Sequence, residues 1–211
     1  MTADRAQSFM AILLTDVSLA IERNEHAATQ ATRRDLMRVG FAALEGVAWI
    51  YRECVVEWAG LLDQLSPAEA GALAEVVYNV SEHGQISDQR RYLSLVPMIR
   101  LTARIAKRLD PSIELDFSSV HWAQLRRAIT TRNRVTHPKC LADMVIAAAE
   151  AEECIAGFFW FLEQTARTME ASNTALRDYI GGMSEILQQL EAGDPQTLLE
   201  YAEVVRLMQD N

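Results

Sequence analysis

Arginine, asparagine and histidine lie close together in the segment Arg132-Asn133-Arg134-Val135-Thr136-His137-Pro138. Five steps along an α-helix leave two side chains about 140° apart, so an unbroken helix would keep Arg132 and His137 on different faces. A proline, however, pushes the preceding residue out of the helical region, which predicts a helix end near Thr136 and lets His137 turn back towards Arg132. A cation and an imidazole that converge at a helix end suit phosphate chemistry.

The spacing alone is weak evidence, because a chain with this many arginines contains roughly one such Arg–His pair by chance. Context adds weight. The apolar residues of the same predicted helix recur at steps of three and four, and Arg132 lies in line with them, where a guanidinium is costly unless it is paired or used. One alternative is a buried ion pair, for which Glu45 is the candidate partner. For His137 the alternative is a favourable charge at a helix C-terminus.

The charges are distributed unevenly along the chain. The 211 residues carry a net charge of −9, which argues against a general nucleic-acid binder. Two acid-free segments, between Asp88 and Asp110 and between Asp116 and Asp143, nevertheless contain eleven of the twenty basic residues. The chain from Asp143 onwards is strongly acidic. This asymmetry predicts a basic side that attracts an anionic ligand, or basic and acidic helices that neutralise each other.

The apolar periodicity is helical throughout, and no segment alternates convincingly at period two, so the sequence predicts an all-α fold. The long second helix has a wide apolar stripe that suits a bundle core better than a dimer seam. Ser66-Pro67-Ala68-Glu69 is a capping box that begins the third helix, and Gly84 is its expected end. The expected helices cover residues 4–23, 32–65, 67–84, 96–109, 119–136, 141–171, 172–190 and 195–208.

Neither a membrane span nor a signal peptide is expected, because the apolar runs are short and the N-terminus lacks a cleavage signal. The three cysteines (Cys54, Cys140 and Cys154) have no metal-ligand spacing, and their odd number favours a reducing, cytoplasmic location. The sequence also lacks clustered carboxylates and a glycine-rich phosphate loop, so neither a metal nor a cofactor is expected.

From Arg33 to Lys139 the sequence resembles the HEPN superfamily of nucleotide-binding domains. The resemblance covers about residues 30–165 and rests on several segments in matching order. They are Arg33 to Gly46, Leu65 to Glu69, Tyr78 to Gly84, Tyr92 to Leu95, Asp116 to Ser118 and the Arg132–His137 motif followed by Pro138-Lys139. It implies an up-and-down helical bundle over residues 31–168. The expected N-terminal helix at 1–30 and the C-terminal helical extension at 169–211 lie outside the resemblance.

The resemblance also implies a function. Catalytic members of the superfamily are metal-independent endoribonucleases in which two subunits bring their motifs together, and other members are inactive binding modules. Arg132, Asn133 and His137 would then be catalytic, with Glu45 in a supporting role. The cations expected to guide the RNA backbone are Arg126, Arg127, Arg134 and Lys139. We therefore expect a homodimeric ribonuclease, as a toxin or defence component, with an antitoxin or nucleotidyltransferase as a further partner. A non-catalytic module that binds a nucleotide or a protein is the alternative.

Overall fold

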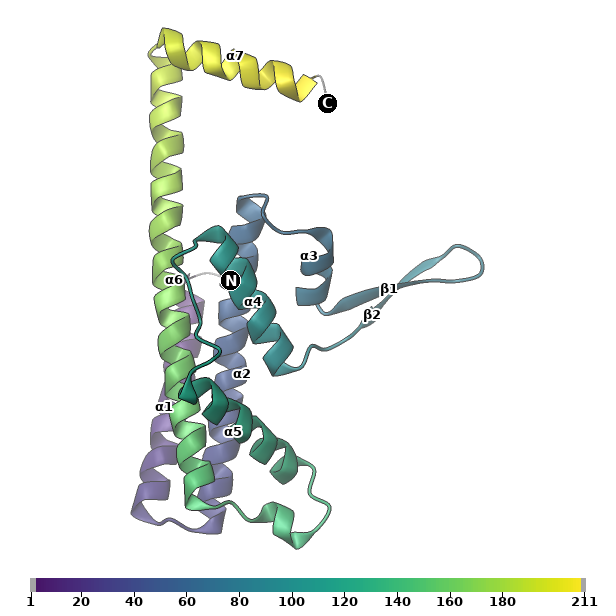
Figure 1. The fold of residues 1–211 in the computed structure, drawn as a ribbon, viewed down its shortest axis with the longest axis vertical. Coiled ribbons are helices and arrows are strands. Elements are labelled where there is room, and N and C mark those ends of the chain that lie inside the picture. Colours follow the sequence, from purple (N-terminus) through teal and green to yellow (C-terminus); the bar gives the residue numbers. More distant parts are fainter. Residues whose placement is uncertain (1–2, 210–211) are drawn as a thin grey trace.

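The computed structural model describes the backbone of residues 3–209 and the side chains of residues 9–207. Within this range the chain forms seven α-helices and one two-stranded sheet, which confirms the all-α prediction (Figure 1). No helix in it is both long and apolar enough to span a membrane. The elements are α1 (Ala3–His26), α2 (Gln30–Leu61), α3 (Pro67–Leu73), β1 (Val76–Val80), β2 (Ile86–Arg90), α4 (Leu95–Leu109), α5 (Val120–Thr136), the 3-10 helix η1 (Leu141–Met144), α6 (Ala148–Glu191) and α7 (Pro195–Gln209).

Helix α2 is the centre of the bundle. Helices α1, α4 and α6 pack along it, and α5 packs against α6. This arrangement follows from the wide apolar stripe of α2, whose core residues include Val47, Tyr51 and Val55. A second core cluster lies nearer the start of α2, where Phe41 packs with residues of α5 and α6. The stripe therefore serves as a bundle core, as its width predicts.

Two glycines let α6 approach its neighbours closely. A Cβ atom at Gly157 would lie only 2.8 Å from the Cα atom of Leu125, so α5 crosses α6 at a distance that only glycine permits. At Gly40 of α2 a Cβ atom would lie 3.3 Å from Sγ of Cys154. Burial raises the pKa of Cys154 to about 12, so this thiol stays neutral and packs as a small apolar group.

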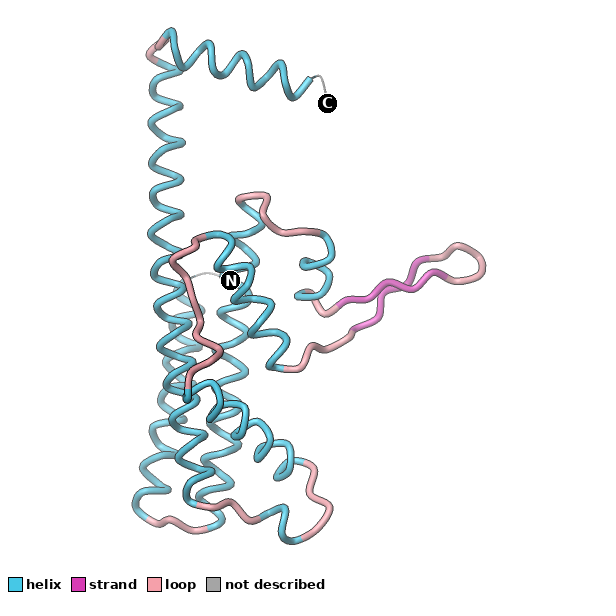
Figure 2. The backbone as a smooth tube through the Cα atoms, in the orientation of Figure 1, coloured by secondary structure: helices cyan, strands magenta, loops and turns pink. Residues whose placement is uncertain are grey.

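The predicted third helix is wrong over most of its length. It begins at the Ser66 capping box as expected, but α3 ends at Leu73 and the chain then forms a β-hairpin that projects from the bundle (Figure 2). Glu75 has a positive φ of 57°, which breaks the helix, and the β-branched and aromatic residues that follow favour a strand. Gly84 is left-handed, with φ of 74°, but it lies in the hairpin turn.

The sixth and seventh predicted helices are also wrong in their boundaries. Residues 141–144 form the short helix η1, an extended link follows, and α6 then continues without a break through Ser172, where the sequence predicted the start of a separate helix. Ser172 is buried inside the helix. No proline or glycine lies near it to stop the helix, so a serine alone is an insufficient signal. The link and the long α6 together determine how the end of α5 is held.

We predict that Gly157→Ala destabilises the protein by about 1–3 kcal/mol, because the added methyl group overlaps the backbone of Leu125. Urea unfolding followed by circular dichroism measures the change. Gly60→Ala is the matched control, since a Cβ atom there meets nothing within 4 Å. Equal stability of the Gly157→Ala and Gly60→Ala proteins would contradict the close crossing.

Candidate functional site

The local structure of α5 presents the motif at the end of a helix. Ser119 caps the start of α5, and its hydroxyl accepts a hydrogen bond from the N–H of Trp122 at 3.2 Å. The helix ends at Thr136, as Pro138 predicts. His137 is the C-terminal cap residue, and its N–H donates to the carbonyl of Asn133 at 3.0 Å.

Arg132 is held by three groups. Its Nη2 atom lies 2.8 Å from Oε1 of Glu45, and its Nη1 atom donates to Oδ1 of Asn133 at 3.3 Å. The guanidinium also lies over the ring of Phe41, 6.0 Å from its centroid. The expected pairing with Glu45 is thus present, but it is not buried, because the Arg132 side chain is 32% exposed and that of Glu45 is 48% exposed. The guanidinium is oriented and still accessible.

A pocket of about 330 Å³ opens beside Arg132. It lies between the first half of α2 and the end of α5, and Glu45 and the exposed Arg38 border it with Arg132. The rest of its lining is mostly apolar. The remaining lining residues are Met37, Phe41, Ala42, Val135 and Thr136. The cation Arg38 was missed by the sequence reasoning, although it lies on α2 close to Phe41, on the face that the pocket uses.

A second pocket, of about 540 Å³, shares Glu45 with the first. It lies between α2 and the base of the hairpin, and the aromatic residues Trp49 and Tyr92 border it. Arg52 lies in its wall with only 11% of its side chain exposed, and the Nε atom of Arg52 is buried without a hydrogen-bond partner. The two pockets therefore form adjoining hollows on one side of α2.

His137 is exposed and stands apart from Arg132 within one chain. Among the described side chains none forms a hydrogen bond or ion pair with the His137 ring, and His137 does not line the pocket beside Arg132. The expected return of His137 towards Arg132 is thus not seen in a single chain. Asn133 contacts Arg132 through its side chain and His137 through its carbonyl.

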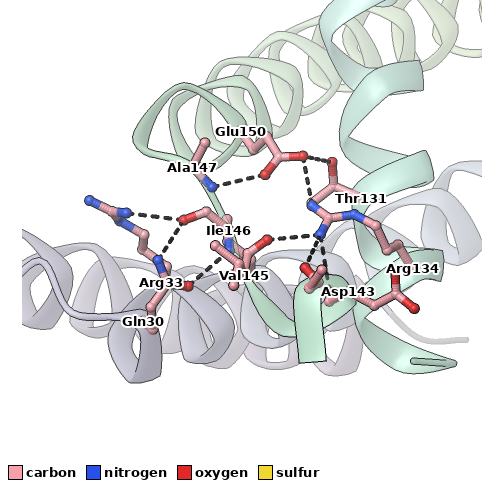
Figure 3. A network of polar contacts seen from close by, with 10 residues as sticks. Gln30, Arg33, Thr131, Arg134, Asp143, Val145, Ile146, Ala147 and Glu150 are labelled. Carbon is pink, nitrogen blue, oxygen red and sulfur yellow. Dashed lines mark hydrogen bonds and ion pairs between the residues drawn. The ribbon is translucent and has the colours of Figure 1, made fainter. Parts of the chain in front are cut away.

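Arg134 organises the segment that follows the motif (Figure 3). Its Nη1 atom donates to the carbonyl oxygens of Ala142, Asp143 and Val145 at 3.2, 3.1 and 2.8 Å. Its Nη2 atom lies 2.7 Å from Oε1 of Glu150, in the first turn of α6. A phosphate would have to displace these partners to bind Arg134. Arg134 therefore joins the end of α5 to the start of α6. We call Arg134 and Glu150 together the clamp.

The start of α2 holds the same segment from the other side. The Gln30 side chain exchanges two hydrogen bonds with the backbone of Ile146, donating at 3.0 Å and accepting at 2.8 Å (Figure 3). Arg33 donates to the Ile146 carbonyl at 3.0 Å, and Arg34 donates to that of Met144 at 3.1 Å. The sequence reasoning missed these residues, because their bonding partners are backbone atoms more than one hundred positions away.

The other expected phosphate-binding cations are spread along α5 and beyond it. Arg127 is engaged, with its Nε atom 2.7 Å from Oε1 of Glu153. Arg126 and Lys139 are exposed, and neither side chain has a hydrogen-bond or ion-pair partner among the described residues. None of these three lines the pocket beside Arg132. A single chain therefore does not gather the basic residues into one cleft.

The carboxylate of Glu150 is the acidic centre of the clamp. Its partial burial by itself raises the pKa, but hydrogen bonds from the Ala147 N–H, the Thr131 hydroxyl and the Arg134 guanidinium outweigh that effect. The pKa of Glu150 consequently lies below its ordinary value. Because the folded-state pKa is lowered, the clamp stabilises the protein above the pKa of the unfolded chain, and the contribution is lost as the pH falls through the folded-state value.

We predict that Glu150→Gln lowers the free energy of unfolding by about 1–2 kcal/mol at neutral pH, since charged hydrogen bonds are lost from a partly exposed site. The difference from the unsubstituted protein should shrink as the pH falls below 4.5, the ordinary pKa of a glutamate. Denaturant unfolding at a series of pH values measures both effects. Glu152→Gln, on the exposed side of the same helix turn, should change neither stability nor its pH dependence.

No three histidine, cysteine, aspartate or glutamate side chains in the described part of the chain lie close enough together to hold a metal ion. Within one chain the structure brings Arg132 together with Asn133, Glu45 and Arg38, and it leaves His137 outside their pocket. No protein-family model matches the chain, and no curated protein or solved structure is significantly similar to it.

Proposed function

We propose that the protein is a metal-independent endoribonuclease of the HEPN type, which cleaves RNA at a site formed across a homodimer. The observation that carries the proposal is an oriented but accessible guanidinium, Arg132, at the wall of an open pocket and five residues before an unengaged histidine, His137. Cleavage of RNA by its own 2′-hydroxyl requires a cation that binds the phosphate and a side chain that acts as a general base.

In the proposed reaction the ribose 2′-oxygen attacks the adjacent phosphorus and the bond to the 5′-oxygen breaks. His137 takes the 2′-hydroxyl proton, the leaving 5′-oxygen takes a proton from solvent water, and His137 then returns its proton to the solvent, so the products are a 2′,3′-cyclic phosphate and a 5′-hydroxyl. Arg132 binds the nonbridging oxygens, on which negative charge accumulates. Glu45 and Asn133 hold the Arg132 guanidinium in place before the substrate arrives.

Two chains are needed because one chain leaves His137 outside the Arg132 pocket. In a symmetric pair of α5 helix ends, His137 of each chain would face the pocket of the other. Arg126 and Lys139 have no partners among the described side chains and would contact the RNA backbone. Their contribution makes binding sensitive to salt and only weakly dependent on sequence.

The second pocket suits a base next to the cleaved phosphate. Trp49 and Tyr92 offer aromatic faces on which a base can stack. Glu45 separates this pocket from the one beside Arg132. A single-stranded substrate could lay its phosphate on one side of Glu45 and its base on the other.

We predict that His137→Ala lowers the rate of RNA cleavage at least about 100-fold, the usual contribution of a general acid–base group, without lowering the melting temperature. Cleavage of total RNA or tRNA in the presence of a chelator, followed on a denaturing gel, measures the rate. His83→Ala is the matched control, because His83 is an exposed histidine in the hairpin turn. Growth arrest on expression, present with the unsubstituted protein and absent with His137→Ala, is a companion test. Cleavage that persists in the His137→Ala protein would defeat the enzyme proposal.

The second candidate function is a non-catalytic module for a nucleotide or a protein partner such as a nucleotidyltransferase or an antitoxin. It is favoured by the Arg132–Glu45 ion pair, which occupies the guanidinium in the single chain, and by the distance of His137 from the pocket. In that case Arg132 would serve to join α5 to α2. Its removal would alter stability or partner binding, and no cleavage would be found with any variant.

Arg132→Lys separates these two functions. The pair with Glu45 is partly exposed, and such pairs contribute about 0–1 kcal/mol, which a lysine can largely retain. If Arg132 binds phosphate through two parallel N–H groups, the substitution should leave the unfolding midpoint nearly unchanged. It should also lower the rate of RNA cleavage at least about tenfold. Glu45→Gln, which removes the same ion pair and keeps the guanidinium, is the companion variant. Equal, small losses of stability with unchanged activity in both variants would assign Arg132 to structure.

A further inference from the structure

The C-terminal part of the chain, which we call the arm and define as residues 173–207, extends beyond the bundle. Ser172 is the last buried residue of α6, and no residue of the arm is buried. Figure 1 shows the end of α6 rising above the other helices and α7 turning away from it at the top. A short isolated helix is only marginally stable in water, so a helix of this kind usually gains its stability from packing.

Large apolar side chains are exposed along both helices of the arm. On α6 they are Tyr179, Ile180, Met183, Ile186 and Leu187, and on α7 they are Leu198, Leu199, Tyr201 and Val204. Their exposed fractions run from 44% at Met183 to 73% at Leu199. Scattered apolar residues are ordinary on a protein surface, but a contiguous set on two helices marks an interaction surface.

The spacing on α6 indicates how many helices cover this surface. If Leu176 is placed at position a of a heptad, then positions a, d and e are all apolar through Leu190. They are Leu176, Met183 and Leu190 at a, Tyr179 and Ile186 at d, and Ile180 and Leu187 at e. A stripe of a and d alone suits a two-helix seam, whereas the added e position widens it for more than one neighbour. The α7 of the same chain leaves it exposed.

The charges favour a second copy as the occupant. The arm is acidic, with Asp178 and Glu185 at position c of α6, away from the apolar stripe. The g positions that flank the stripe hold Ala175, Gly182 and Gln189 and carry no charge. The b positions on the other flank hold Arg177, Ser184 and Glu191, so the two flanks together carry one base and one acid and do not select a basic partner. Two copies of the stripe can meet without placing acid against acid.

We infer that the arms of two chains pack together, α6 and α7 of one against α6 and α7 of the other, around a two-fold axis. A two-fold interface uses the same patch on both chains, which suits a surface that is complementary to itself. The nine exposed apolar side chains, with their polar rim, provide an area of the order of the roughly 800 Å² per partner that stable interfaces bury. At Gly182 a Cβ atom would meet nothing within 4 Å in the single chain, so the partner backbone has room to approach there.

This interface is separate from the pairing of the α5 ends in the proposed function. The arm and the end of α5 lie at opposite ends of the molecule (Figure 1). A chain that uses both surfaces forms an assembly larger than a dimer. The inference about the arm therefore stands or falls independently of the RNA cleavage assay.

Sedimentation of the purified full chain tests the arm. The double variant Ile180→Glu/Leu187→Glu places charges at two exposed positions of the stripe, and it should halve the particle mass of the unsubstituted protein. Leu199→Glu on α7, the most exposed of these apolar positions, should do the same. Gln188→Glu adds the same charge at position f, outside the stripe, and should leave the mass unchanged.

Circular dichroism and the melting curve of the bundle confirm that each variant is folded, which is expected because the substituted side chains are exposed. A monomeric mass for the unsubstituted protein at high micromolar concentration overturns the inference. The same conclusion follows if the double variant and Leu199→Glu both keep the unsubstituted mass while folded. A halved mass with RNA cleavage unaltered would support the arm interface and leave the proposed reaction to its own test.

Discussion

The close crossing of α5 and α6 at Gly157 is the constraint on which the candidate site depends. The α5 backbone packs directly against α6 at this point. Any sliding of one helix along the other would bring a side chain into the contact, so their relative position is fixed. The Arg134–Glu150 contact then joins the end of α5 to the first turn of α6. Because both helices also pack against α2 or its neighbours, the position of Arg132 relative to Glu45 is a result of helix packing rather than of a loop.

The site contains two ion pairs with different roles, Arg134–Glu150 and Arg132–Glu45, each of which we call a layer. Arg134 bonds to Glu150 and to the backbone carbonyls of Ala142, Asp143 and Val145, so this layer maintains structure. Arg132 is about as exposed as Arg134, but its one ionic partner, Glu45, is 48% exposed and both residues border an open pocket, so their pairing can be exchanged for a ligand at small cost. Two arginines separated by one residue therefore face different environments, because successive residues of a helix point in different directions.

Much of the bundle could be predicted from the sequence, because strong local signals coincide with burial. The stripe of α2, the capping box at Ser66 and the helix end before Pro138 all lie where expected. The hairpin was missed because its strands are exposed on both faces and so show no alternation of apolar and polar residues. The pairing of Arg132 with Glu45 was predictable, because both border apolar stripes. The backbone partners of Arg33 and Arg34 were not, since no side-chain pattern encodes a carbonyl acceptor.

Helix α6 joins the two ends of the molecule as one continuous rod of 44 residues. Gly157 lies much nearer its start than its end, about 10 Å from Glu150 and about 45 Å from Leu187 at the rise of an α-helix. Below the arm, α6 is packed in the bundle from Ala151 to Ser172, a stretch of about 30 Å, so the arm is a lever anchored over a long seat and not at a single point. A load applied to the arm would therefore be borne by this packed stretch before it reached the segment after His137.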